Sequence, residues 1–176
     1  MWTYQEILFD TRPELLVETG TQYGGSALFY ATLFDLLGAG EVITIDVDTS
    51  QVHPSVVAHP RVTVIAASST EPSVFDRVRP LSEGRRTMVV LDSDHQRDHV
   101  SAELRCWSPL VSQGCYLVVE DTALGTRYLP GWGGSLAAID EWLPQHPEFV
   151  RDRGREKFLI TVNGGGYLRR VEASQR

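Results

Sequence analysis

The sequence predicts a doubly wound α/β fold, in which helices cover both faces of a mostly parallel sheet. Two observations lead to this prediction. Short apolar runs rich in β-branched residues recur along the 176-residue chain, as expected of parallel strands buried on both faces. Segments with helical periodicity separate these runs, and such alternation is typical of α/β sheets. At roughly 100–200 residues per domain, we expect residues 1–176 to form one domain.

Six apolar runs are candidates for strands. Each is four or five residues long, except the first, which consists of Leu15-Leu16-Val17 and leads into Glu18-Thr19-Gly20. The last follows a short extended piece at 148–150. In chain order, the candidate strands are 15–17, 42–45, 62–65, 88–91, 116–119 and 158–162.

Four helices are expected between the strands. One should begin near Gly25 and stop at Gly38, because glycine commonly ends a helix. Another should begin at 70–72, where Thr70 can cap the helix and Pro72 suits the first turn. The apolar stripes of the other two helices end before Gly114 and at Pro144. The apolar residues at helical spacing run over 27–37, 100–111 and 136–143.

Composition excludes several classes of protein. Lys and Arg number 16 against 23 Asp and Glu, a net charge of -7, and no basic run exceeds two residues, so no nucleic-acid partner is expected. A signal peptide and an apolar stretch of about 18 residues are both missing, so we expect no membrane partner and a cytoplasmic location. Cys106 and Cys115 lack the spacing of a zinc or redox site.

The turn after the first strand indicates a bound ligand. The segment 18–26 is rich in glycine and leads into a helix, whose free N–H groups can face a ligand. Asp46 ends the second strand, where a carboxylate commonly accepts hydrogen bonds from a ribose. The alternative is a tight turn with an acid that caps a helix. The dinucleotide fingerprint is absent, since Gln22 stands at one of its positions, and this argues against an NAD(P)-linked oxidoreductase.

Acidic residues follow the fourth and fifth candidate strands. Asp92 and Asp94 end one strand and Glu120 and Asp121 the other, which would crowd carboxylates at one edge of the sheet. Such groups repel one another, and Mg²⁺ relieves that repulsion. The alternative is that these acids cap helices. Because adjacent strand residues face opposite ways, both acids of the second pair can reach one metal only if the strand has ended by Asp121.

His95 lies one residue beyond the first acidic pair. A neutral imidazole there could take a proton from a bound hydroxyl. The alternative is a polar residue in the first turn of a helix. We expect His99, one helical turn later, to lie behind the site or at the surface.

These segments resemble class I S-adenosylmethionine-dependent methyltransferases. Residues 17–27 are similar to the turn that binds the methionine end of the cofactor, and 91–95 and 118–121 carry the most specific part of the resemblance. Within the class, the chain most resembles the cephalosporin hydroxylase/rhamnosyl O-methyltransferase family, which includes metal-dependent sugar O-methyltransferases of macrolide biosynthesis. The resemblance spans Arg12 to Phe158. It implies a Rossmann-like methyltransferase sheet, mostly parallel, with an antiparallel late strand.

The resemblance also implies roles for individual residues. His95 would be the catalytic base, and Asp92, Glu120 and Asp121 would ligate Mg²⁺. Asp46 would hold the ribose, and Ser68 and Ser69 would lie at the adenine edge. The full set expected around S-adenosyl-L-methionine is Glu18, Gly20, Thr21, Tyr23, Gly24, Ser26, Asp46, Ser68, Ser69 and Asp92.

The expected activity is Mg²⁺-dependent methyl transfer to a hydroxyl of a small natural-product substrate. A sugar, glycoside or polyol is the first choice and a catechol-like phenol the second. The alternative is a non-catalytic S-adenosylmethionine-binding partner of a biosynthetic enzyme. Trp2, Tyr4, Ile7 and Leu8 are apolar for a free terminus. We expect them to pack on the flank of the sheet or on another subunit, in a homo-oligomer.

Overall fold

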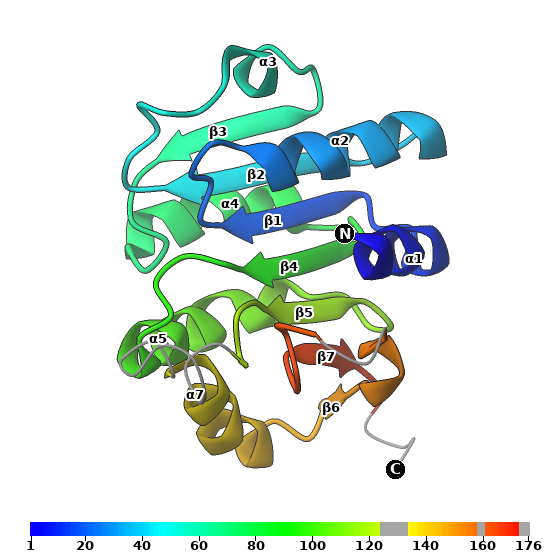
Figure 1. The fold of residues 1–176 in the computed structure, drawn as a ribbon, viewed down its shortest axis with the longest axis vertical. Helices are drawn as coiled ribbons and strands as arrows, with labels where there is room; N and C mark the ends of the chain where they lie inside the picture. The colour runs from blue at the N-terminus through cyan, green and yellow to red at the C-terminus, as the bar shows by residue number, and fades with distance from the viewer. Residues whose placement is uncertain (124–133, 158–160, 173–176) are drawn as a thin grey trace.

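A seven-stranded sheet forms the centre of the molecule in the computed structural model, which describes residues 1–123, 134–157 and 161–172. The strand order is β3-β2-β1-β4-β5-β7-β6 (Figure 1). The first five strands are parallel, and β7 is antiparallel to both of its neighbours, which confirms the predicted sheet. The strands are β1 Leu15–Thr19, β2 Glu41–Asp46, β3 Val62–Ala66, β4 Thr87–Leu91, β5 Tyr116–Val119, β6 Phe149–Arg151 and β7 Tyr167–Arg170.

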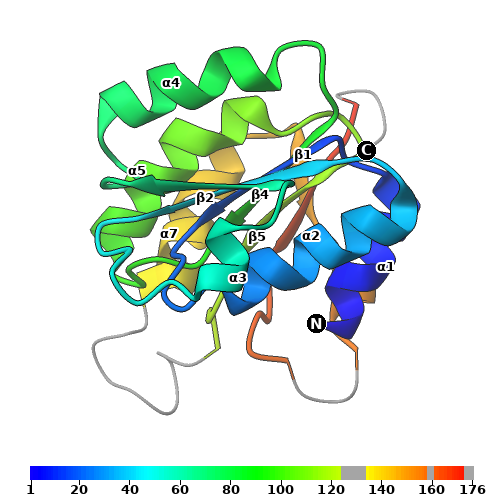
Figure 2. The same ribbon diagram turned by 90° about the horizontal axis from the view of Figure 1, so that it is seen from above.

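Helices cover both faces of this sheet. Figure 2 shows α1, α2 and α3 on one side and α4 and α5 on the other, and α7 packs beside α5. The structure also has short 3₁₀ turns at 108–110, 143–145 and 153–155. The helices are α1 Trp2–Thr11, α2 Gly25–Leu37, α3 Pro54–Val57, α4 Pro72–Ser82, α5 Arg97–Trp107 and α7 Gly134–Trp142.

The sheet separates two apolar cores, because alternate residues of a strand face opposite ways. Leu15 and Val17 of β1 pack with residues of α4 and α5. Leu16 packs with residues of α1 and α2. Glu18 is two residues after Leu16 on the same strand and therefore faces the same side of the sheet. Its carboxylate lies on the α1–α2 side, where it is fully buried.

The predicted helices form, with differences at their ends. The helix α2 begins at Gly25 and is capped by Gly38 at φ 80°, as expected. The expected cap of α4 is wrong by one residue: Glu71 is the N-cap, and the Thr70 hydroxyl instead lies 3.0 Å from that of Ser68. The helix α5 ends at Trp107, and the last turn of its apolar stripe is a 3₁₀ turn.

The chain ends differ most from expectation. Residues 158–160 of the predicted 158–162 strand lie outside the described residues, and Thr161 and Val162 are not in a strand. The late antiparallel strand is β7, and β6 overlaps the extended piece expected at 148–150. The first residues form the helix α1, which the sequence did not predict. Its Tyr4, Ile7 and Leu8 are buried against the sheet, which confirms packing on the flank for these three residues, whereas Trp2 is 61% exposed.

No helix in the described parts of the chain is long and apolar enough to cross a membrane.

Candidate active site

A cavity of about 810 Å³ opens at the carboxyl ends of the parallel strands. This is the edge at which open α/β sheets bind ligands. Gln22, Asp94 and His99 are among its lining residues. The predicted site residues that line it are Gly20, Thr21, Tyr23, Ser26, Asp46, Ser68, Ser69, Asp92, His95 and Asp121. Three predicted residues lie beside this cavity and do not line it, namely Glu18, Gly24 and Glu120.

Two glycines give the turn after β1 its shape. Gly20 has a φ of 86°, and a Cβ atom there would lie 1.9 Å from the carbonyl oxygen of Asp92. Only glycine therefore allows the turn to lie against the end of β4. Gly24 has a φ of 81°, and its missing Cβ makes room for Val56 of α3. Gly20 thus shapes the cavity wall, whereas Gly24 supports it from behind.

Asp46 holds the turn. Its Oδ2 atom accepts hydrogen bonds from the backbone N–H groups of Thr21 at 2.8 Å and Gln22 at 2.9 Å, and Oδ1 accepts from that of Asp48 at 3.1 Å. This is the contact expected of a tight turn with a supporting acid. Asp46 also lines the cavity, so its role toward a ribose stays a prediction.

Glu18 lies behind the cavity wall. The Thr44 hydroxyl donates to its Oε2 atom at 2.7 Å, and the hydroxyls of Thr44 and Thr21 are also 2.7 Å apart. The Oε1 atom is buried and has no hydrogen-bond partner among the described residues. Burial raises the pKa of Glu18 to about 7. This buried acceptor would be stabilised by a cationic donor in the cavity.

Asp92, His95 and Asp121 form a compact cluster. One ligand atom from each lies within 4.8 Å of the others, and Nε2 of His95 is 3.5 Å from Oδ2 of Asp121. Burial raises the pKa of Asp92 to about 8, and the charges of Glu120, Glu18 and Asp121 act in the same direction. A divalent cation would remove this conflict, so the cluster fits a metal ion.

Glu120 and Asp121 both follow the end of β5. The strand stops at Val119, and Asp121 has a φ of 56°, so the chain has left the extended conformation. The side-chain oxygen of Asn163 accepts a hydrogen bond from the Asp121 N–H at 3.0 Å and holds this turn. The strand has therefore ended before Asp121, which is the condition for Glu120 and Asp121 to approach one metal. Sequence reasoning missed Asn163, although the adjacent glycines 164–166 do indicate a turn.

Glu120 lines a second cavity, of about 470 Å³, which also reaches Asp92. The hydroxyl of Tyr4, on α1, donates a hydrogen bond to Oε1 of Glu120. Burial raises the pKa of Glu120, and the bond from Tyr4 opposes that effect. Glu120 is not in the compact cluster, so its role as a metal ligand stays a prediction. Tyr4 was predicted to pack on the sheet but not to contact an active-site acid.

His99 lines the large cavity next to Ser69 and Ser93. Its Nε2 atom is 3.3 Å from the Ser69 hydroxyl, 3.1 Å from that of Ser93 and 3.5 Å from the Glu103 carboxylate. The hydrogen bond with Glu103 raises the pKa of His99. His99 thereby connects Ser69, at the predicted adenine edge, to the end of β4.

Comparison with known sequences identifies relatives along nearly the whole chain. The family model described as Rhamnosyl O-methyltransferase/CmcI matches residues 1–171. The rhamnosyl O-methyltransferase of Mycobacterium tuberculosis (strain ATCC 25618 / H37Rv) is 38% identical over 175 residues, which cover 96% of this chain and 71% of that protein. The enzyme of the same name from Mycobacterium leprae (strain TN) is 36% identical and is covered to 76%.

Solved structures share the fold. The CmcI-D160 structure with Mg and SAM superposes with a TM-score of 0.70 at 21% identity, covering 97% of this chain and 70% of that one. MycE in complex with Mg, SAH and mycinamycin VI superposes with a TM-score of 0.69 at 19% identity. The match covers 98% of this chain and 49% of MycE. The apo structure of CalS11, a TDP-rhamnose 3'-O-methyltransferase, superposes with a TM-score of 0.64 at 14% identity. The match covers 96% of this chain and 76% of CalS11.

Proposed function

The chain belongs to the rhamnosyl O-methyltransferase/CmcI family of S-adenosylmethionine-dependent methyltransferases, and from this premise we propose the reaction that it catalyses. The reaction is Mg²⁺-dependent transfer of a methyl group to a hydroxyl of a small glycoside or polyol. The observation that carries the proposal is the cluster of Asp92, His95 and Asp121 in the wall of the large cavity. A catechol-like phenol is the second choice of acceptor.

The large cavity supports a site for S-adenosylmethionine. The turn at Gly20 and the beginning of α2 at Ser26 form one end of its wall, with the unpaired oxygen of Glu18 buried behind them. A ligand with an amino group fits there, because a cation would stabilise that carboxylate. Asp46, at the end of β2, and Ser69, in the turn after β3, also line this cavity. These positions suit the ribose and the adenine of the same ligand.

The acids support a site for Mg²⁺. Asp92 and Asp121 would hold the ion, and Glu120 is the third proposed ligand, beside Asp92 in the second cavity. Mg²⁺ prefers oxygen ligands to nitrogen, so we assign His95 as the base that accepts the hydroxyl proton at Nε2. When bound, Mg²⁺ would lower the pKa of the acceptor hydroxyl, and S-adenosylmethionine would supply the methyl group.

We also propose that the chain forms a homo-oligomer. Trp2, Phe9 and Leu36 are 61%, 59% and 80% exposed, and they line one groove together with charged residues of α1 and of the segment after β6. Large exposed apolar side chains that lie together often mark a protein interface. Sedimentation of the purified protein at micromolar concentration measures this directly, and a monomer would contradict it.

The test of the reaction combines binding and turnover. Calorimetry should detect binding of S-adenosylmethionine and none of NAD. A methyl-transfer assay with a simple rhamnoside and with catechol should show turnover that stops with excess chelator and returns with Mg²⁺. Full activity in excess chelator would contradict the metal-dependent reaction. Cofactor binding with no transfer to any hydroxyl acceptor would instead favour the non-catalytic partner protein.

A further inference from the structure

Tyr4 of α1 contacts one of the proposed metal ligands, which is far away in the sequence. Its hydroxyl donates a hydrogen bond to Oε1 of Glu120, 116 positions later in the chain. We propose that Tyr4 is a positioning residue, which holds the Glu120 carboxylate in the orientation that binds Mg²⁺. This inference rests on the proposed function, and it adds how α1 contributes to the metal site.

The sheet fixes the backbone of Glu120 but not its carboxylate. The N–H of Glu120 donates to the carbonyl oxygen of Leu91 at 2.9 Å, which continues the pairing of β4 with β5. Several rotatable bonds separate this backbone from the carboxylate, which forms hydrogen bonds with Tyr4 and with Asn163. These two side chains, and not the strand, therefore determine where the carboxylate lies.

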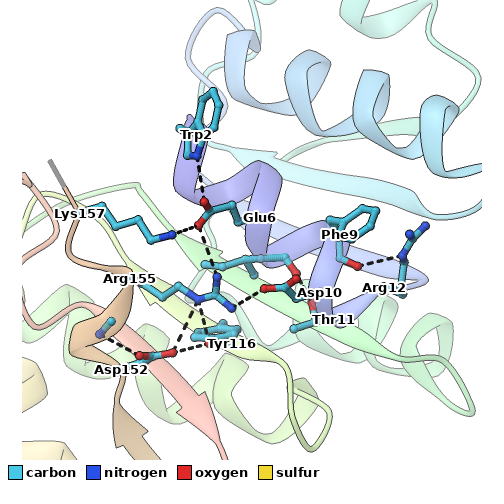
Figure 3. Close-up of polar contacts among 12 residues, drawn as sticks. Trp2, Glu6, Phe9, Asp10, Thr11, Arg12, Tyr116, Asp152, Arg155 and Lys157 are labelled. Atoms are coloured by element: carbon cyan, nitrogen blue, oxygen red, sulfur yellow. Dashed lines mark hydrogen bonds and ion pairs between the residues drawn. The ribbon is translucent and has the colours of Figure 1, made fainter.

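The hydroxyl of Tyr4 is itself held in place by the packing of α1. Tyr4 is 4% exposed, and its ring lies against that of Tyr30, with the two centroids 5.2 Å apart. Further along α1, Asp10 accepts a hydrogen bond from Arg155 at 2.9 Å (Figure 3). None of these contacts involves a ligand, so α1 presents the hydroxyl to Glu120 as part of the fold.

A phenol is chemically suited to orient a metal-binding carboxylate. Its usual pKa is about 10, so at neutral pH it keeps its proton and donates it to the carboxylate. An ionised carboxylate can accept roughly four hydrogen bonds, so Glu120 can accept from Tyr4 and still offer an oxygen lone pair to a cation. Side chains that orient metal ligands in this way typically contribute roughly 10- to 100-fold to metal affinity.

The first test compares Tyr4 with a matched tyrosine. Tyr116 is buried in the same core as Tyr4 and also donates to a carboxylate, that of Asp152, at 2.6 Å. Neither Tyr116 nor Asp152 lines either cavity of the site. Tyr4→Phe should raise the dissociation constant of Mg²⁺ roughly 10- to 100-fold, and Tyr116→Phe should leave it unchanged. Calorimetric titration with Mg²⁺ in the presence of S-adenosylhomocysteine measures both.

Two controls distinguish positioning from a general loss of structure. Thermal unfolding verifies that both variants are folded at the temperature of the titration. Tyr4 does not line the large cavity, so Tyr4→Phe should leave the dissociation constant of S-adenosylmethionine unchanged when no metal is present. An unchanged Mg²⁺ affinity in Tyr4→Phe, equal losses in the two variants, or a matching loss of S-adenosylmethionine affinity would overturn the role of Tyr4.

The second test substitutes the ligand itself. Because Tyr4 is proposed to act through Glu120, removing the charge of Glu120 should weaken Mg²⁺ binding at least as much as removing the hydroxyl of Tyr4. Glu120→Gln keeps the size of the side chain and should therefore raise the dissociation constant of Mg²⁺ by at least the same factor as Tyr4→Phe. A smaller effect of Glu120→Gln would overturn the inference.

Titration of the wild type separates failure of this inference from failure of the proposed reaction. Mg²⁺ binding by the wild type that Tyr4→Phe does not weaken would leave the metal-dependent reaction standing and reject the role of Tyr4 alone. No Mg²⁺ binding by the wild type in the presence of S-adenosylhomocysteine would contradict the metal-dependent reaction, and the role of Tyr4 with it.

Discussion

Carboxylates occur in two contrasting settings on either side of α1. On the outer side, Arg155 donates to Asp10 at 2.9 Å and Lys157 donates to Glu6, so each acid has a basic partner from the segment that follows β6 (Figure 3). At the carboxyl edge of the sheet, Glu18, Asp92 and Glu120 lie near one another, and no ion pair to Lys or Arg is found for them among the described residues.

The pKa values follow this difference. The hydrogen bond from Lys157 lowers the pKa of Glu6. Burial raises the pKa of Glu18 to about 7 and that of Asp92 to about 8. The same type of side chain is thus stabilised as an anion in one region and destabilised in the other.

This difference shows which region needs no ligand to stabilise its carboxylates. The outer contacts join α1 to β5 as well, because Arg155 also donates to the Tyr116 hydroxyl at 3.2 Å. They need no ligand to be satisfied. The acids at the sheet edge accept hydrogen bonds from Thr44 and Tyr4. Only protons or a cation from solution can neutralise their charge, so this region gains stability when a cation binds. The carboxylates of the outer region are paired within the fold, whereas those at the sheet edge are left to bind protons or a cation.

The largest expected effect comes from Asp92. Asp92→Asn should reduce methyl transfer by roughly 10³-fold or more, because a metal contributes several kcal/mol of stabilisation to such a reaction. Without metal, the same substitution should raise Tm, since it removes one of the crowded charges. Turnover assays and thermal unfolding in chelator measure the two effects. A variant that loses activity and also Tm would show that the edge carboxylates are structural after all.

His95 should have the next largest effect. His95→Gln should lower kcat by roughly 10²–10⁴-fold, the contribution of a general base, with Mg²⁺ affinity unchanged. Calorimetric titration with Mg²⁺ is the control, since weaker binding would make His95 a metal ligand. Wild-type turnover in His95→Gln would remove it from the reaction.

The raised pKa of Glu18 can be tested by measuring the free energy of unfolding at two pH values. Its folded pKa of about 7 exceeds its unfolded value, so the folded protein binds the proton more tightly. Without ligands, stability should therefore fall as pH rises from about 4.5 to 7. Glu18→Gln should be more stable than the wild type at pH 8, by about 1–3 kcal/mol. Urea unfolding at pH 5 and pH 8 measures this, with the exposed Glu83→Gln as a control that should change little.

Arg155 tests the outer region and should have the smallest effect. Arg155→Met should lower the free energy of unfolding by about 1–2 kcal/mol, because it removes hydrogen bonds from a charged, mostly buried group. Methyl transfer well below Tm should be kept. Arg153→Met is the matched control, since Arg153 is 61% exposed and pairs only locally with Glu156. Equal destabilisation by both substitutions would contradict a special role for Arg155.

Much of the fold follows from short stretches of sequence. The apolar runs of β1 to β5 and the glycines that bound α2 predict their elements, because each pattern reflects local burial or local backbone geometry. Asp92 and Asp121 were predicted to meet because parallel strands end at one edge of a sheet, and they do. The position of the late strand β7 was not predicted, since only the first two of its four residues, Tyr167 and Leu168, are apolar and buried, and Arg169 and Arg170 follow them.

The sequence by itself therefore determined the parallel sheet, the edge at which the large cavity opens and the residue types gathered there. The tertiary structure decided which of those residues touch. Tyr4 donates to Glu120 from 116 positions away, and Asn163 holds Asp121 from 42 positions away. Such contacts depend on how α1 and the turn before β7 pack on the finished sheet. Local propensities describe only neighbours in sequence, so they predict the elements but not the contacts between distant ones.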